Sequence, residues 1–339
     1  MFFKKISIVA FAAILGASGA NAYEYKSGNS TFKINAQGTI GAINPDFEEP
    51  LFINDWRVRG EYGYEITEDR KLGLMYAMDA LSYDEDEVAR DAFLVFQDKS
   101  IGRFEVGFTD SVAKKMGLGL PDVGGLRVNE SPIFYKKINP NGNVISDLSL
   151  NTDNYVPRIN YVSPLKQGMQ YGLSIAGITN RYNFATDAAV KIRKSTGKTK
   201  TAFAFGLSFM DSPDNYSADP YSAAVTADWR AQVSASMNLQ YNSWIWGVTA
   251  RAIYDQDPIG PATDGINVGT GISYDLLKYT LSASYVFSDT GIWDDTKDYL
   301  AHSALLSFRY KYSENADMWM SVGITTDTPF FGVGIRGKF

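Results

Sequence analysis

The chain contains no cysteine and only one histidine, His302. Without cysteine there can be no disulfides, no thiolate nucleophiles and no cysteine-ligated metals. Beyond residue 22, no stretch approaches the roughly 18 consecutive apolar residues that a membrane-spanning helix needs. The net charge is −6 at pH 7, and no basic run indicates a nucleic-acid partner. These absences argue against thiol chemistry, a helical membrane domain and nucleic-acid binding.

The chain is instead rich in residues that favour strands and tight turns. Aromatic residues make up 14% of it, and it holds 30 glycines. Apolar and polar residues alternate over long ranges, as in 277–288, where Tyr279, Leu281 and Phe287 alternate with lysine, threonine and serine. Alternate side chains of a strand point to opposite faces, so each such range predicts a strand with one apolar and one polar face. The same alternation is found in 55–64, 201–210, 230–241 and 243–254.

The lengths of these strands predict a membrane barrel. They reach about ten residues or more, the length a tilted strand needs to cross a bilayer, against about five or six in soluble sheets. Their connections are of two kinds, as in membrane barrels with short turns on one side and longer loops on the other. The expected turns are 67–70, 97–100, 163–168, 195–199, 241–243, 275–277 and 312–316. The expected loops are 43–52, 82–89, 111–155, 180–186, 211–222, 255–264, 289–298 and 325–329.

Seven turns interleaved with eight loops predict sixteen antiparallel strands, with fourteen or eighteen as alternatives. Lipid offers no hydrogen-bond partners, so strands can satisfy their backbone groups in a membrane only by closing into a barrel. A barrel of sixteen strands is too wide for side chains to fill, and its interior holds water. We therefore predict an all-β, transmembrane, antiparallel β-barrel with both chain ends on the turn side, the periplasm.

The first 22 residues predict a secretory signal peptide. Lys4 and Lys5 form a positive start, residues 6–15 form an apolar segment, and Ala20-Asn21-Ala22 matches an A-x-A cleavage site. The apolar segment is well short of a membrane span. We expect cleavage after Ala22, which leaves residues 23–339 as a single barrel domain.

The last ten residues read FFGVGIRGKF and predict a closing strand. Phe331, Val333, Ile335 and Phe339 share its apolar face, while Arg336 lies on the other face. A strand of this kind at the end of a chain is typical of outer-membrane barrels, where it pairs with the first strand. It indicates the outer membrane of a Gram-negative bacterium and an assembly signal read by the barrel-assembly machinery.

The third loop, 111–155, is the longest connection and is unusually rich in glycine and apolar residues. It contains GLGLPDVGGLRVNESPIF. Two interpretations stay open: an external loop, or a loop folded back into the lumen to narrow it.

Within this loop, Pro121, Asp122, Gly124 and Gly125 carry a resemblance. The run Pro121-Asp122-Val123-Gly124-Gly125 resembles the PEFGG motif in the third loop of the general bacterial porins, with Asp and Val in place of Glu and Phe. The resemblance implies that the loop enters the lumen and that its acidic residues face arginines on the barrel wall. The matching loop residues are Asp122 and Glu130. The matching wall residues are Arg57, Arg59, Arg90 and Arg158.

The alternation supports an inward position for two of these arginines. Arg57 and Arg59 have the opposite parity to Trp56 and Val58, so they face the lumen. An arginine facing lipid at the bilayer midplane would cost roughly 2–4 kcal/mol. Opposed charges across a narrow pore set ion preference, although any one of these residues could instead be an ordinary hydrated lumen residue.

Three other patterns carry less weight. The run GVGIRG at 332–337 matches a dinucleotide-binding pattern, but no helix follows it. His302 and Ser303 point to opposite faces, which argues against a Ser–His catalytic pair, and His302 is expected on the barrel exterior. The acidic run 84–87 could bind Ca²⁺ or bridge lipopolysaccharide through divalent ions, but a hydrated loop accounts for it as well.

The resemblance implies a homotrimeric porin that admits small hydrophilic solutes and ions by passive diffusion, surrounded by outer-membrane lipid and lipopolysaccharide. It implies no enzymatic activity, no cofactor and no bound metal. Three alternatives remain. A channel specific for sugars or dicarboxylates would need an aromatic track in the lumen, to which Trp319 alone could contribute. The others are a barrel protease or lipase and a barrel that does not conduct.

Overall fold

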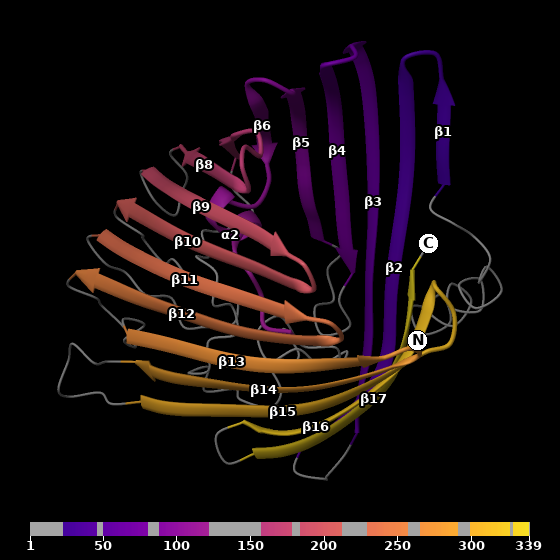
Figure 1. The fold of residues 1–339 in the computed structure, drawn as a ribbon, viewed down its shortest axis with the longest axis vertical. Coiled ribbons are helices and arrows are strands. Elements are labelled where there is room, and N and C mark those ends of the chain that lie inside the picture. Colours follow the sequence, from indigo (N-terminus) through magenta and orange to yellow (C-terminus); the bar gives the residue numbers. More distant parts are fainter. Residues whose placement is uncertain are drawn as a thin grey trace.

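The computed structural model describes residues 23–45, 50–80, 88–121, 157–177, 184–211, 229–256, 265–290, 299–325 and 328–338 (Figure 1). Within these ranges it contains one short helix, α2 (Val112–Met116), and the strands of a single antiparallel sheet. The strands are β1 (Tyr23–Ser27), β2 (Ser30–Pro45), β3 (Leu51–Thr67), β4 (Arg70–Ala80), β5 (Val88–Asp98), β6 (Gly102–Phe108), β7 (Pro157–Val162), β8 (Met169–Ala176), β9 (Phe184–Thr196), β10 (Thr199–Asp211), β11 (Trp229–Tyr241), β12 (Trp244–Gln256), β13 (Gly265–Leu276), β14 (Tyr279–Thr290), β15 (Tyr299–Lys311), β16 (Ala316–Thr325) and β17 (Thr328–Lys338). No helix in these ranges is both long and apolar enough to cross a membrane.

The sheet closes on itself through its last and second strands. From β2 to β17 each strand pairs antiparallel with the next along the chain, and β17 pairs with β2 from Phe330↔Pro45 to Lys338↔Gln37. The result is a closed barrel of sixteen strands, which confirms the predicted fold and strand count. Closure leaves no sheet edge along the ring, as a lipid environment requires.

One strand was not predicted from the sequence. β1 pairs with β2 from Tyr23↔Ile34 to Ser27↔Ser30, whereas β17 pairs with residues 37–45 of the same strand. β1 therefore continues the row of β17 and does not widen the ring. The hairpin turn between β1 and β2 is Gly28-Asn29, with Gly28 at φ 55°. Glycine adopts positive φ without steric cost, and one favoured type of two-residue hairpin turn requires it at the first central position.

The short turns lie close to their predicted positions. The β9–β10 turn is 197–198, the β11–β12 turn is 242–243 and the β13–β14 turn is 277–278. Asn242 and Leu277 adopt positive φ, both at 52°, to reverse the chain within two residues. The predicted signal peptide lies outside the described residues, as does the acidic run 84–87.

The outer face of the barrel is apolar and ends in two aromatic girdles. Leu94, Leu207 and Leu306 lie along it with 55%, 60% and 59% of their surfaces exposed. Aromatic rings cluster on strand ends near the short turns at Tyr161, Tyr171, Trp244, Tyr274, Tyr279 and Tyr310. A second group lies near the loops at Phe209, Trp229, Tyr254, Tyr285 and Phe287. Apolar bands between two aromatic girdles are typical of membrane barrels.

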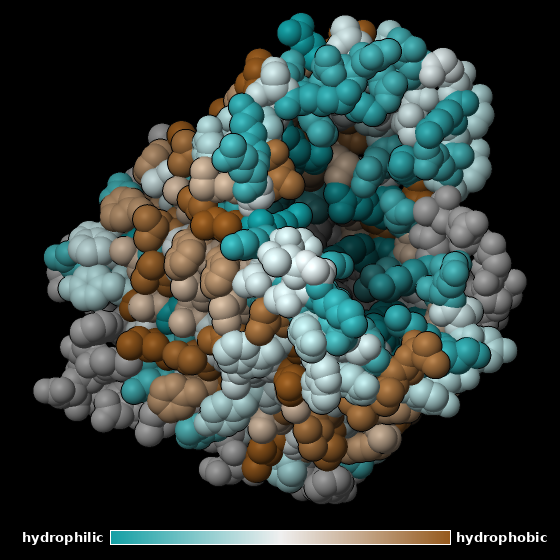
Figure 2. Space-filling view, viewed as in Figure 1, coloured by the Kyte–Doolittle hydropathy of each residue, from teal (hydrophilic) through white to brown (hydrophobic). Residues whose placement is uncertain are grey.

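The inner face is mainly polar. Figure 2 shows hydrophilic residues around a hollow near the centre of the view and hydrophobic residues over the outer surface of β9–β12. Hydroxyl groups of neighbouring strands pair on this face, as between Ser303 and Thr325 and between Ser307 and Ser321, both at 2.9 Å. Trp319 is an exception: it also faces inward, with 2% of its surface exposed. Its ring fills the space over two cross-strand glycines, Gly334 and Gly41.

Candidate functional site: loop three on the inner wall

The first part of loop three, residues 109–121, lies inside the barrel. Helix α2 packs against the inner face of β7–β10 (Figure 1). Val112, Ala113 and Met116 of α2 are buried and form an apolar cluster with Ala189 of β9. Gly172 of β8 makes room for this helix. A Cβ at that position would overlap the Val112 side chain and come within 3.2 Å of the Met116 sulfur.

After α2 the loop continues along the wall formed by β11–β13. The amide of Leu118 donates to the Ser236 hydroxyl at 3.2 Å, and the Asn238 side-chain amide donates to the Gly119 carbonyl at 3.3 Å. Pro121 then lies against two inner-wall glycines of β12 and β13, Gly247 and Gly271. Residues 109–121 thus cross the inner wall from β6 to β13. The rest of the loop, residues 122–156, lies outside the described part of the chain.

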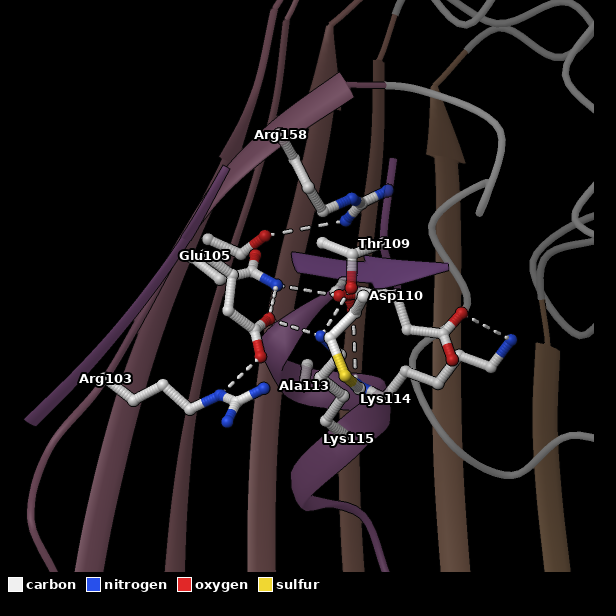
Figure 3. Close-up of polar contacts among 12 residues, drawn as sticks. Arg103, Glu105, Thr109, Asp110, Ala113, Lys114, Lys115 and Arg158 are labelled. Carbon is white, nitrogen blue, oxygen red and sulfur yellow. Dashed lines mark hydrogen bonds and ion pairs between the residues drawn. The ribbon is translucent and has the colours of Figure 1, made fainter. Parts of the chain in front are cut away.

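Glu105 of β6 is the centre of the contacts that attach α2 to the wall (Figure 3). Its side chain is 4% exposed and accepts hydrogen bonds from Arg103 Nε at 2.8 Å and Asn160 Nδ2 at 3.0 Å. Lys115 of α2 forms an ion pair with the same carboxylate and lies 4.8 Å from the centre of the Phe93 ring. Burial lowers the pKa of the Lys115 ammonium, and the attraction of Glu105 opposes that shift. The buried carboxylate thus ties the helix to β6 through an ion pair whose basic partners stay partly exposed.

Asp187 of β9 holds the beginning of α2. Its carboxylate accepts from the amide of Ala113 at 2.8 Å, while the Ser111 hydroxyl accepts from the amide of Lys114 at 3.2 Å. Both contacts satisfy amides that have no partner within the helix. The guanidinium of Arg158 lies 3.7 Å from the Asp187 carboxylate, and these two side chains are 1% and 2% exposed. The first turn of α2 is therefore fastened to β9 and β7.

The structure places the predicted wall arginines at different points. Arg57 and Arg59 are exposed on the inner face of β3, and Arg59 pairs with Glu61 at 3.1 Å. The backbone of Arg90 belongs to β5. Arg158 lies behind α2 beside Asp187, on a different stretch of wall from Arg57 and Arg59.

One of the predicted loop residues is among those that the structure describes. Pro121 lies on the inner wall, as described above. The other predicted loop positions lie outside the described residues: Asp122, Gly124, Gly125 and Glu130. The predicted contact of Asp122 and Glu130 with the wall arginines therefore stays a prediction.

The described positions of the predicted closing strand fall on the outer face. Phe331, Val333 and Ile335 share the outer side of β17, and Val333 is 39% exposed. Phe339 lies outside the described residues. His302 also faces outward, as predicted, with its Nδ1 2.6 Å from the Tyr285 hydroxyl. Among the described residues, no group of acidic or histidine side chains could hold a metal ion.

Glu105, Lys115 and Asp187 were not identified from the sequence. A weak signal exists for Glu105, because it alternates with Phe104 and Val106 and so had to face the lumen. Lys115 and Asp187 carry no such signal, since their roles depend on where a loop meets the wall.

The sequence matches no known family profile and no curated protein sequence. Several solved structures have a fold similar to that of this chain. OmpT of Vibrio cholerae, folded in vitro and in its trimer form, aligns with a TM-score of 0.62 and 14% identity, covering 92% of this chain and all of that one. OmpF of Salmonella typhi in complex with daunomycin aligns with a TM-score of 0.65 and 11% identity over 94% of this chain and all of that one. A mutant of the Rh. blastica porin aligns with a TM-score of 0.57 and 15% identity over 91% of this chain and all of that one.

At these identities the likeness concerns the fold. The alignments cover the whole of each of these solved chains, so the likeness extends around the entire barrel. This agrees with the closed ring described above. The chain has the sixteen-stranded barrel fold of bacterial outer-membrane porins, a fold whose setting is the outer membrane.

Proposed function

We propose that the protein is a porin, a water-filled channel through which small hydrophilic solutes and ions diffuse passively across the outer membrane. One observation carries the proposal: residues 109–121 are fastened along a polar inner wall and so narrow the lumen from one side. A loop held against the wall leaves an open path beside it, and hydrated solutes can pass there.

The constriction would lie between loop three and β3. In a ring of sixteen strands, β11 lies half-way round from β3. Pro121 rests on β12 and β13, on the side of the ring opposite Arg57 and Arg59. Asp122 and Glu130 would then face Arg57, Arg59 and Arg90 across the pore. Arg158 would act on the pore through its contact with Asp187 and α2.

We propose a homotrimer as the assembled form. One of the similar structures, OmpT of Vibrio cholerae, is described as a trimer form. The apolar outer face that extends over β16, β17 and β2 would pack against neighbouring subunits or lipid, with lipopolysaccharide around the outer girdle. The outer side of β17 would serve as the signal read by the barrel-assembly machinery.

We also propose that the protein has no enzymatic activity. His302 lies on the outer face against Tyr285, while Ser303 points inward to Thr325, so this pair cannot cooperate on one substrate. We expect the purified barrel to leave peptide and ester substrates intact. Turnover that is lost on substituting a lumen residue would contradict this part of the proposal.

Swelling of lipid vesicles containing the refolded protein tests the proposed diffusion. Sugars of increasing mass should enter at rates that fall smoothly with their size, because the path is an unspecific water-filled opening. Rapid entry of one sugar or dicarboxylate alone would favour a substrate-specific channel. Vesicles that hold a folded barrel and admit nothing would reject the porin function.

A further inference from the structure

The inner wall carries more basic than acidic side chains, although the whole chain has a net charge of −6. Strand alternation assigns each charge on the described strands to the inner or outer face. The inward basic residues with described side chains are Lys26, Lys33, Arg57, Arg59, Lys71, Arg103, Arg158, Lys191, Arg193, Lys200, Arg230, Arg251, Arg309, Lys311, Arg336 and Lys338. The inward acidic residues with described side chains are Glu24, Glu61, Glu65, Asp91, Glu105, Asp187, Asp275 and Asp317. By backbone register, Asp55, Asp79 and Asp255 also occupy inward positions, so the acidic positions are still fewer than the basic ones. The described wall is therefore positively charged.

Most of the inward acids are already neutralised by basic neighbours. Glu24 contacts Lys26 at 2.9 Å and Lys33 at 3.0 Å. Asp317 contacts Arg336 at 2.9 Å. Five further acids form ion pairs on the same face. The pairs are Glu61 with Arg59, Glu65 with Lys71, Glu105 with both Arg103 and Lys115, Asp187 with Arg158, and Asp275 with Arg309. These acids can offset little of the charge on other basic residues.

One group of basic residues forms no ion pair within the part of the chain that the structure describes. Lys191 and Arg193 lie two residues apart on the inner face of β9, and Lys200 lies on the same face of β10. Arg193 pairs in register with Ala202 and Lys200 with Ser195, so Arg193 and Lys200 are diagonal neighbours about 7–8 Å apart. We call these three residues the basic patch.

The basic patch lies open to the lumen near the short turns. Arg193 and Lys200 are exposed, and Lys191 is half-buried. Two amide side chains share the face, because Gln170 is opposite Lys191 in β8 and Gln240 is opposite Lys200 in β11. Like charges held so close together destabilise a sheet. An anion between them removes that repulsion, whereas water only screens it.

We propose that the basic patch binds small anions carrying phosphate or carboxylate groups and gives the channel a preference for anions. This inference rests on the proposed porin function. The patch attracts anions into the turn-side half of the lumen, where low-dielectric walls strengthen its field. Each bound anion leaves again because three flexible, hydrated cations hold it without a closed cage.

Reversal potentials in a potassium chloride gradient test the proposal on the refolded protein in planar bilayers. The unaltered channel should favour chloride over potassium. The double variant Lys191→Gln/Arg193→Gln should lower the anion-to-cation permeability ratio by about threefold or more, as expected for two charges several ångströms from the path. The matched control Lys194→Gln/Lys198→Gln removes two charges from the same hairpin, one on the outer face and one in the turn. It should leave the ratio unchanged.

Inorganic phosphate added on the turn side provides a second readout. It should reduce the chloride current of the unaltered channel in a saturable way, and the double variant should lose this block. A conducting channel that prefers cations, or a phosphate block equal in the double variant and the control, overturns the inference but leaves the porin function in place. A folded protein that does not conduct at all overturns the porin function itself.

Discussion

At the scale of single residues, Glu105 carries the attachment of loop three. Its carboxylate is almost fully buried and binds Arg103, Lys115 and Asn160 together. Replacing it by glutamine keeps its shape but leaves Lys115 without a counter-charge. We expect Glu105→Gln to lower the free energy of unfolding by about 2 kcal/mol, less than for a fully buried pair because Lys115 and Arg103 keep some contact with water.

Urea titration of the protein in lipid vesicles measures this change, and Glu65→Gln is the matched control. Glu65 also pairs with a lysine, Lys71, but both side chains are about half exposed. Its replacement should have little measurable effect. Equal effects of the two variants would show that Glu105 is not a special attachment point.

The sequence identified some of these residues and not others for a physical reason. Strand alternation alone places Arg57 and Arg59 on the inner face, because the period of a strand is a local property. The contact between Ala113 and Asp187 joins residues 74 positions apart. No local pattern encodes such a contact, since it depends on how an irregular loop lies on a curved wall.

At the scale of elements, the position of α2 depends on a glycine in the strand beneath it, Gly172 of β8. A Cβ at Gly172 would overlap Val112 and approach Tyr161 O at 2.8 Å. We therefore expect Gly172→Ala to shift α2 away from β8 and to increase the noise and frequency of closure in single-channel records. Gly63→Ala is the control, because a Cβ there meets nothing closer than 4.0 Å. Indistinguishable records for the two variants would mean that the helix does not influence the pore.

The two faces of a strand should also respond differently to the same charge. Val233 faces outward on β11 between Trp229 and Tyr241, and Ser234 faces the lumen. We expect Val233→Lys to cost roughly 2–4 kcal/mol of folding free energy and Ser234→Lys to cost little, because only the first places an ammonium in lipid. Folding titrations into vesicles measure both. A larger loss for Ser234→Lys would reverse the assignment of the two faces.

Element prediction succeeded where the period-two pattern was long and failed where it was short. β11, β12 and β14 were recognised by their alternation, and the Asn242-Ser243 turn between β11 and β12 lies where polar residues interrupt it. β1, at five residues, is too short to show a period. Its only signal was Gly28-Asn29, a hairpin turn between two brief runs. The five-residue helix α2 was also missed, since its stability comes from packing against β7–β10 and the Asp187 cap.

At the scale of the whole molecule, the chain separates its residue types between two solvents. Apolar side chains and aromatic girdles face outward, and hydroxyls and paired charges line the interior. The same alternation leaves a positive inner wall in a chain whose total charge is negative. The net charge of the chain therefore does not predict the charge of the lumen. That charge follows from which charged residues face inward.

Single-channel conductance of the refolded protein in a planar bilayer tests this account most directly. An open barrel with loop three held along its wall should give ohmic steps in groups of three, with conductance proportional to that of the bulk salt solution. Steps of this kind would establish a trimeric, water-filled pore. A correctly folded barrel that produces no steps over a wide range of voltage would contradict the account, because the lumen would then be closed.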